Sequence, residues 1–164
     1  MSKLKVPLIF VIGMHRSGTS ALTRALSLLG LNLPDDLLAP NQDNPFGYWE
    51  PKVVVDFNQR LLQRLGRHWS DPKPLSTDWQ LKEVAGFTAS DAAEILSHEY
   101  EKIALRGEFS GIVIKDPRLS RTMPVWLRAA QLCGFDVSCL IACRKPVEVF
   151  KSLQARDKMP REHA

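Results

Sequence analysis

The sequence has little cysteine and no long hydrophobic run. Its three cysteines, Cys133, Cys139 and Cys143, form no C-x-x-C pair, and no histidines stand at metal-ligand spacing. This argues against a disulfide framework and a zinc site, and we expect no metal. We expect buried, reduced thiols at Cys139 and Cys143 and therefore a cytoplasmic protein. No stretch approaches about 18 apolar residues, so we expect no transmembrane segment.

The chain also lacks a concentrated run of positive charge. Its formal net charge is +4 and its pI is about 9.1, but the basic residues are spread along the sequence. This balance suits an anionic ligand, whereas we expect no nucleic acid partner. The composition is ordinary for a globular protein, and 164 residues correspond to a single domain.

Residues 8–20 join a short apolar run to a glycine-bounded loop. Residues 8–12 predict a strand buried on both faces, and apolar residues from Leu22 onward repeat with helical spacing. Gly13 and Gly18 allow the backbone between them to turn tightly and to approach an anion. The N–H groups of the new helix point at the same place. The segment therefore predicts a phosphate-binding corner.

This loop departs from the nucleotide-binding pattern G-x-x-x-x-G-K-[ST] at one position. Gly13 and Gly18 have the required spacing, but Thr19 stands where the lysine would be. Arg16 supplies a fixed cation inside the loop instead. The arrangement resembles the 5′-phosphosulfate loop of sulfotransferases that use 3′-phosphoadenosine 5′-phosphosulfate (PAPS), and the matching residues are Arg16, Ser17, Gly18, Thr19 and Ser20.

Three strand–loop–helix units follow one another along the chain. After the first, strands are expected at 111–114 and 137–142, and the polar segments 115–118 and 144–152 follow them. Such a series predicts an α/β fold of three layers, α/β/α, with a parallel sheet similar to that of P-loop NTPases. The three polar strand ends should meet in one crevice. Further helices are expected from Pro51, over 88–106, from Pro124 and from Pro146.

The segment after the third strand contains a second candidate phosphate anchor. Arg144 leaves the strand and Ser152 lies about two helical turns further on, so that a guanidinium and a hydroxyl can face one phosphate. This segment looks like the 3′-phosphate motif of the sulfotransferases, R-x-P-x-D/E-x-x-x-S, with matches at Arg144, Pro146, Glu148 and Ser152.

Two segments between these anchors extend the resemblance. Residues 44–50 and 115–119 look like segments of bacterial sulfotransferase-family proteins, and the whole resemblance covers residues 8–153. The family normally continues with a basic, glycine-containing loop that completes the 3′-phosphoadenosine pocket. We therefore expect residues 1–164 to be the N-terminal and central part of one sulfotransferase-like domain, with the usual C-terminal portion absent.

The resemblance implies transfer of a sulfuryl group from PAPS to a hydroxyl or amine acceptor without an obligatory metal. Arg16 would stabilise charge on the leaving phosphate. Glu50 is the first candidate for the general base and Asp116 the second. Alternatively, Glu50 is a helix-terminal acid, and Asp116 pairs with a neighbouring cation. The donor-binding residues implied are His15, Arg16, Ser17, Gly18, Thr19, Ser20, Arg144 and Ser152.

The sequence leaves open whether the acceptor is a sugar, a lipid, a peptide or another small molecule, and it does not indicate an oligomeric state. Tyr48 and Trp49 either wall the acceptor site or serve in packing. Two other classes compete with the sulfotransferase. A P-loop nucleotide kinase or NTPase predicts lysine at position 19 and a Walker-B aspartate, and 115–118 match the latter poorly. The second competing class is a module that binds a nucleotide but has no turnover.

Overall fold

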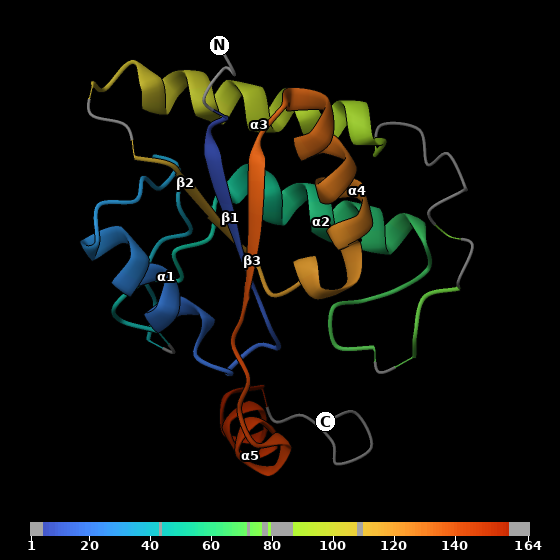
Figure 1. Cartoon of the computed structure of the whole chain (residues 1–164). Coiled ribbons are helices and arrows are strands. Elements are labelled where there is room, and N and C mark those ends of the chain that lie inside the picture. Colours follow the sequence, from blue (N-terminus) through green and yellow to red (C-terminus); the bar gives the residue numbers. More distant parts are fainter. Residues whose placement is uncertain are drawn as a thin grey trace.

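A parallel sheet lies at the centre of the structure (Figure 1). The computed structural model describes residues 5–42, 44–71, 73–76, 79, 87–107 and 110–157. Along the described chain the elements are β1 (Pro7–Ile12), α1 (Thr19–Leu28), α2 (Lys52–Arg64), α3 (Ala89–Ala104), β2 (Ile112–Lys115), α4 (Leu119–Cys133), β3 (Asp136–Ile141) and α5 (Pro146–Asp157).

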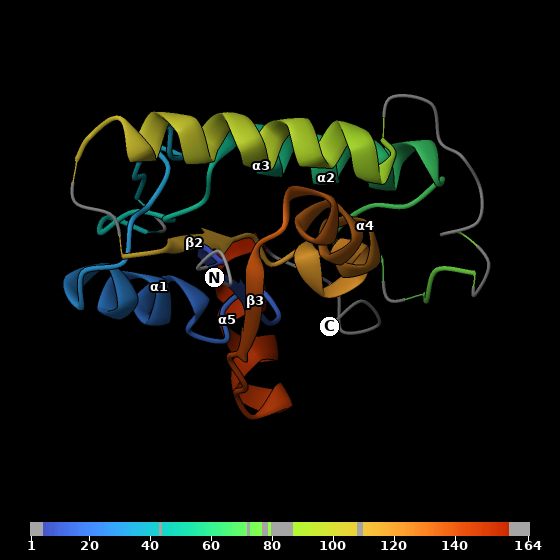
Figure 2. The same cartoon turned by 45° about the horizontal axis from the view of Figure 1, so that its top comes forward.

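The order of the three described strands is β2-β1-β3, and both pairings are parallel. Leu8 of β1 lies opposite Ile112 on one side and Val137 on the other. Helices cover both faces of the sheet, with α2, α3 and α4 on one side and α1 on the other (Figure 2). The predicted α/β architecture with a parallel sheet is therefore confirmed. Helix α5 lies beyond the carboxyl end of β3 (Figure 1).

The main core lies between the sheet and α2, α3 and α4. Leu8 and Phe10 are two residues apart on β1, so their side chains point to the same face of the sheet. Both are buried in this core together with Ile112 and Ile114 of β2. Trp126 of α4 packs edge-on against Phe57 of α2, with ring centroids 5.1 Å apart. This packing fixes the carboxyl ends of β1 and β2, where the polar segments begin.

The helix starts follow the sequence signals, with one exception. Thr88 and Asp91 form the expected capping box at the start of α3, where Asp91 N donates to Thr88 Oγ1 at 3.2 Å. Pro124 was expected to open a helix, but it lies inside α4. The helix begins earlier because Leu119, its first residue, is fully buried, and its N–H donates to the carbonyl of Asp116 at 3.0 Å.

The expectation of buried thiols is wrong for two cysteines. Cys139 and Cys143 are both exposed, and all three cysteines are free. Cys139 lies on β3, which is at the edge of the described sheet, and Cys143 lies in the segment that follows. Within the described part of the chain, none of the helices combines the length and the apolar character that crossing a membrane requires.

Candidate functional site

The loop between β1 and α1 has the tight backbone that its glycines predict. Gly13 has φ of +145°, and a Cβ at this position would lie 2.5 Å from the carbonyl oxygen of Ala142, at the end of β3. Gly18, with φ of +99°, forms the N-cap of α1. Arg16 also has a positive φ, 67°, which is uncommon for a residue with a side chain. The loop therefore winds around the N-terminus of α1 and leaves its first N–H groups facing outward.

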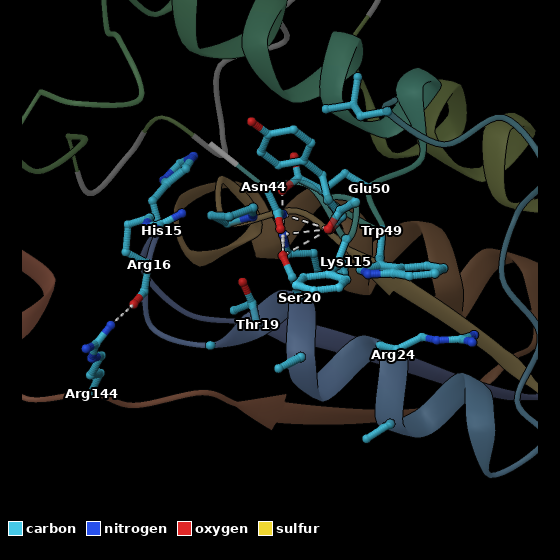
Figure 3. Close-up of a pocket in the computed structure, with 18 of the residues that line it drawn as sticks. His15, Arg16, Thr19, Ser20, Arg24, Asn44, Trp49, Glu50, Lys115 and Arg144 are labelled. Atoms are coloured by element: carbon cyan, nitrogen blue, oxygen red, sulfur yellow. Dashed lines mark hydrogen bonds and ion pairs between the residues drawn. The ribbon is translucent and has the colours of Figure 1, made fainter. Parts of the chain in front are cut away.

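The two predicted phosphate anchors meet at this loop. Arg16 Nε donates to Ser152 Oγ at 2.8 Å, across 136 positions of sequence. Arg144 Nη1 donates to the carbonyl oxygen of Arg16 at 3.2 Å, across 128 positions (Figure 3). Arg144 is also held by Glu148, since its Nε donates to Glu148 Oε2 at 2.9 Å. The first and last strand ends thus form one basic region.

A pocket of about 950 Å³ opens beside these anchors. Residues from all three polar strand ends contribute to its walls, together with the segment 44–50 (Figure 3). The predicted convergence of the strand ends is therefore confirmed. Ser17, Asp116 and Ser152 are predicted site residues that do not line it. Those that do are His15, Arg16, Gly18, Thr19, Ser20, Glu50 and Arg144.

Lys115 joins the pocket walls to one another. This last residue of β2 is buried, and its ammonium donates to the carboxylate of Glu50, to Ser20 Oγ at 3.3 Å and to the carbonyl oxygen of Tyr48 at 3.2 Å (Figure 3). The sequence leaves open whether Lys115 holds the segment of the candidate base, holds an acidic acceptor or is a solvated charge, and the structure shows it buried against Glu50. The available signal was its position, because it ends an apolar strand at the ligand-binding edge of the sheet.

Burial acts on the protonation of both partners. It raises the pKa of Glu50 above its ordinary value, while the positive charge of Lys115 acts in the opposite direction. It lowers the pKa of Lys115, and the Glu50 carboxylate opposes that shift. A carboxyl group with a raised pKa is a better proton acceptor than an exposed one.

Asp116 lies behind the pocket. Its buried carboxylate accepts hydrogen bonds from Asn58 Nδ2 at 2.9 Å and from Arg118 Nη1 at 2.8 Å. Asn58 Oδ1 in turn accepts from Thr122 Oγ1 at 2.7 Å and Trp126 Nε1 at 2.8 Å. Asp116 therefore pairs with a neighbouring cation, Arg118, which is the alternative to a general base that the sequence left open. Its carboxylate fixes Arg118 at the pocket wall.

His15 and Ser17 lie within the loop in different surroundings. The His15 ring is 4.4 Å from the ring of Trp69, and burial, assisted by the charges of Arg118 and Lys115, lowers its pKa well below the usual value. His15 is therefore neutral near pH 7. The buried Ser17 Oγ and Arg118 Nε have no hydrogen-bond partner among the described residues. Such groups beside a pocket suit a polar ligand or water.

Within the described ranges, no cluster of three or more His, Cys, Asp or Glu side chains could hold a metal ion. Comparisons with protein-family models, with curated proteins and with solved structures give no match for this chain.

The ion pair between Lys115 and Glu50 generates a prediction about stability. Lys115→Met removes the nearest cation of the buried Glu50 and leaves only the more distant Arg118, whose Nη1 lies 3.9 Å from Glu50 Oε2. The pKa of Glu50 therefore rises further in the folded state. The folded protein then binds more protons than the unfolded chain. Its free energy of unfolding should fall as the pH rises from the ordinary range of glutamate towards the raised pKa. At neutral pH we expect a loss of about 3–5 kcal/mol relative to the wild type, measured by urea unfolding.

The double variant Lys115→Met/Glu50→Gln is the control for this measurement. It lacks the titrating carboxyl group, so its stability should vary less between about pH 5 and pH 8 than that of the single variant. Equal pH dependence of the two variants would contradict the assignment of the effect to Glu50.

Proposed function

We propose that this chain is a PAPS-dependent sulfotransferase domain, which transfers a sulfuryl group from PAPS to a hydroxyl or amine acceptor. The observation that carries the proposal is the meeting of two basic residues, Arg16 and Arg144, in the wall of one pocket. PAPS carries negative charge on both its 5′ and its 3′ substituents, so it needs two such anchors on one side of a sheet edge.

The two ends of the donor would be held by different parts of the chain. The loop from Gly13 to Ser20 offers N–H groups and hydroxyls to the 5′-phosphosulfate, and Arg16 adds a fixed positive charge. Arg144 and Ser152 would hold the 3′-phosphate. In this arrangement the sulfur would lie near Ser20 and Lys115, which contact each other, and next to Glu50. The free cysteines agree with the cytoplasmic location that we propose.

The proposed reaction follows from this placement. The acceptor oxygen or nitrogen attacks the sulfur, a new bond forms there, and the bond from sulfur to the bridging oxygen of the 5′-phosphate breaks. Glu50 takes the proton of the acceptor, and 3′-phosphoadenosine 5′-phosphate (PAP) leaves. When Glu50 becomes neutral, the ammonium of Lys115 is no longer balanced by a carboxylate. Its charge can then stabilise the negative charge that grows on the leaving phosphate.

The geometry disfavours the nucleotide kinase. In kinases of the G-x-x-x-x-G-K-[ST] type, the hydroxyl at the position of Ser20 holds Mg²⁺ and the preceding lysine reaches the phosphates. Here the preceding residue is Thr19, and the ammonium of Lys115 lies 3.3 Å from Ser20 Oγ. A fixed cation at this hydroxyl would repel a metal ion.

Titration calorimetry with two nucleotides separates these two classes. We expect PAP to bind at least about tenfold more tightly than ATP with Mg²⁺, because both basic anchors then meet a phosphate. Preferential binding of ATP with Mg²⁺ would favour the kinase and overturn the proposal.

Replacement of Arg144 tests the second anchor. Arg144→Ala should weaken PAP binding by about 2 kcal/mol, since it removes a charge-assisted contact to the 3′-phosphate. Adenosine 5′-phosphosulfate lacks that phosphate, so its binding should change little in the same calorimetric experiment. Lys145→Ala is the matched control, because Lys145 is also exposed, is adjacent in sequence and does not line the pocket. Equal losses for both nucleotides would refute the assignment of Arg144.

Replacement of Glu50 tests the general base. Glu50→Gln should lower the rate of sulfate transfer by about 100-fold or more, because general-base catalysis is lost, while PAP binding stays intact. Turnover is measured with labelled PAPS, and Glu101→Gln, an exposed position on α3, is the control. Unchanged turnover would exclude Glu50 as the base. Tight PAP binding by a wild-type protein without turnover would indicate a nucleotide-binding module.

A further inference from the structure

The pocket extends past Glu50 to an end that lies away from Arg144 (Figure 3). In Figure 3 Arg144 lies at one side of the pocket, Glu50 in the middle, and Trp49 and Arg24 at the opposite side. Large, exposed apolar side chains also line the pocket. Leu28 of α1 and Phe46 are 70% and 85% exposed, although both belong to residue types that are usually buried. Apolar surface gathered at a pocket mouth is typical of a binding site.

The wall that carries Trp49 is fixed in place before any ligand arrives. Asn44 Nδ2 donates to the carbonyl oxygen of Gly47 at 2.6 Å, and the Tyr48 hydroxyl donates to Asn41 Oδ1 at 2.7 Å. The ammonium of Lys115 also donates a hydrogen bond to the carbonyl oxygen of Tyr48. Trp49 has φ of 58°, a left-handed conformation that costs about 1–3 kcal/mol for a bulky residue and is found preferentially at functional sites.

Arg24 brings a positive charge to this end. Its guanidinium carbon lies 4.9 Å from the centroid of the Trp49 ring, and it forms no ion pair with any carboxylate among the described residues. Three other cations of the pocket are balanced, because Lys115, Arg118 and Arg144 each have a carboxylate partner. The charge of Arg24 is thus open to a ligand.

Two neutral hydrogen-bonding groups of the segment that carries Trp49 already have partners within that segment. The amide nitrogen of Asn44 and the hydroxyl of Tyr48 are engaged within the loop. A sugar, with hydroxyls around its ring, would find these two groups already engaged. A flat apolar body can instead lie against Phe46, Trp49 and Leu28.

We infer that the acceptor has a flat, apolar body and carries an acidic group, which Arg24 binds while the acceptor hydroxyl faces Glu50. The roles of the hydroxyl and of Glu50 rest on the proposed function, whereas the binding of the acidic group rests on Arg24, Trp49 and the apolar side chains alone. Arg24 is thus assigned as a specificity-determining residue at the end of the pocket opposite the donor.

A pair of probes that differ in charge tests this inference. Hydroxynaphthoate and its neutral amide, hydroxynaphthamide, have the same flat body and the same hydroxyl. We expect the acid to bind about tenfold more tightly than the amide by titration calorimetry, because it gains a charge-assisted contact. Arg24→Gln should abolish this preference and leave PAP binding unchanged. Arg128→Gln, an exposed arginine on α4 outside the pocket, is the control and should keep the preference.

The inference is overturned if the acid and the amide bind equally, if neither binds, or if Arg24→Gln retains the preference. Tighter binding of methyl glucoside than of hydroxynaphthoate would also overturn it, in favour of a sugar acceptor. Each titration is carried out with and without saturating PAP. If PAP binds but the acid and the amide bind equally, the acceptor class is contradicted and the sulfotransferase proposal is not. If PAP fails to bind, the sulfotransferase proposal is contradicted, and the titrations without PAP still test whether Arg24 binds the acidic group.

Discussion

The buried ion pair between Lys115 and Glu50 is the constraint on which the rest of the site depends. Each charge would cost several kcal/mol to bury alone, so the segment that carries Glu50 has to close onto the end of β2. The same ammonium also reaches Ser20 at the start of α1 and the carbonyl of Tyr48. One side chain thereby joins the loop between β1 and α1, the sheet and the segment 44–50 that forms a wall of the pocket.

A second buried network sets the position of the remaining charges. Asn58 of α2 connects Asp116 to Thr122 and Trp126 of α4, and Asp116 holds Arg118 at the pocket wall. The helical layer therefore takes part in the site, because a shift of α2 or α4 would move these groups. The pocket gains a basic end at Arg16 and Arg144 and a mixed aromatic and basic end at Trp49 and Arg24. Glu50 lies between the two ends (Figure 3).

Much of the fold could be predicted because its signals are local. Glycines at 13 and 18, an apolar run before them and a helical stripe after them are sufficient to predict the tight strand–loop–helix turn, and Thr88 with Asp91 is sufficient to predict a helix start. The predictions that are wrong have non-local causes. Pro124 predicts a helix start, but α4 begins five residues earlier, at Leu119, because the side chain of Leu119 is buried in the core. The sequence pattern predicts a buried Cys139, but it is exposed on β3, at the edge of the sheet that the structure describes.

The sequence by itself determined the parallel α/β architecture, the glycine-bounded loop and the two basic motifs, because strand, turn and helix signals depend on neighbouring residues. Only the tertiary structure decided which charges meet. It placed Arg144 against Arg16, paired Glu50 with Lys115 and turned Asp116 away from the pocket. The reason is physical: the partner of a buried charge is chosen by the packing of segments far apart in the chain, and no local pattern records that choice.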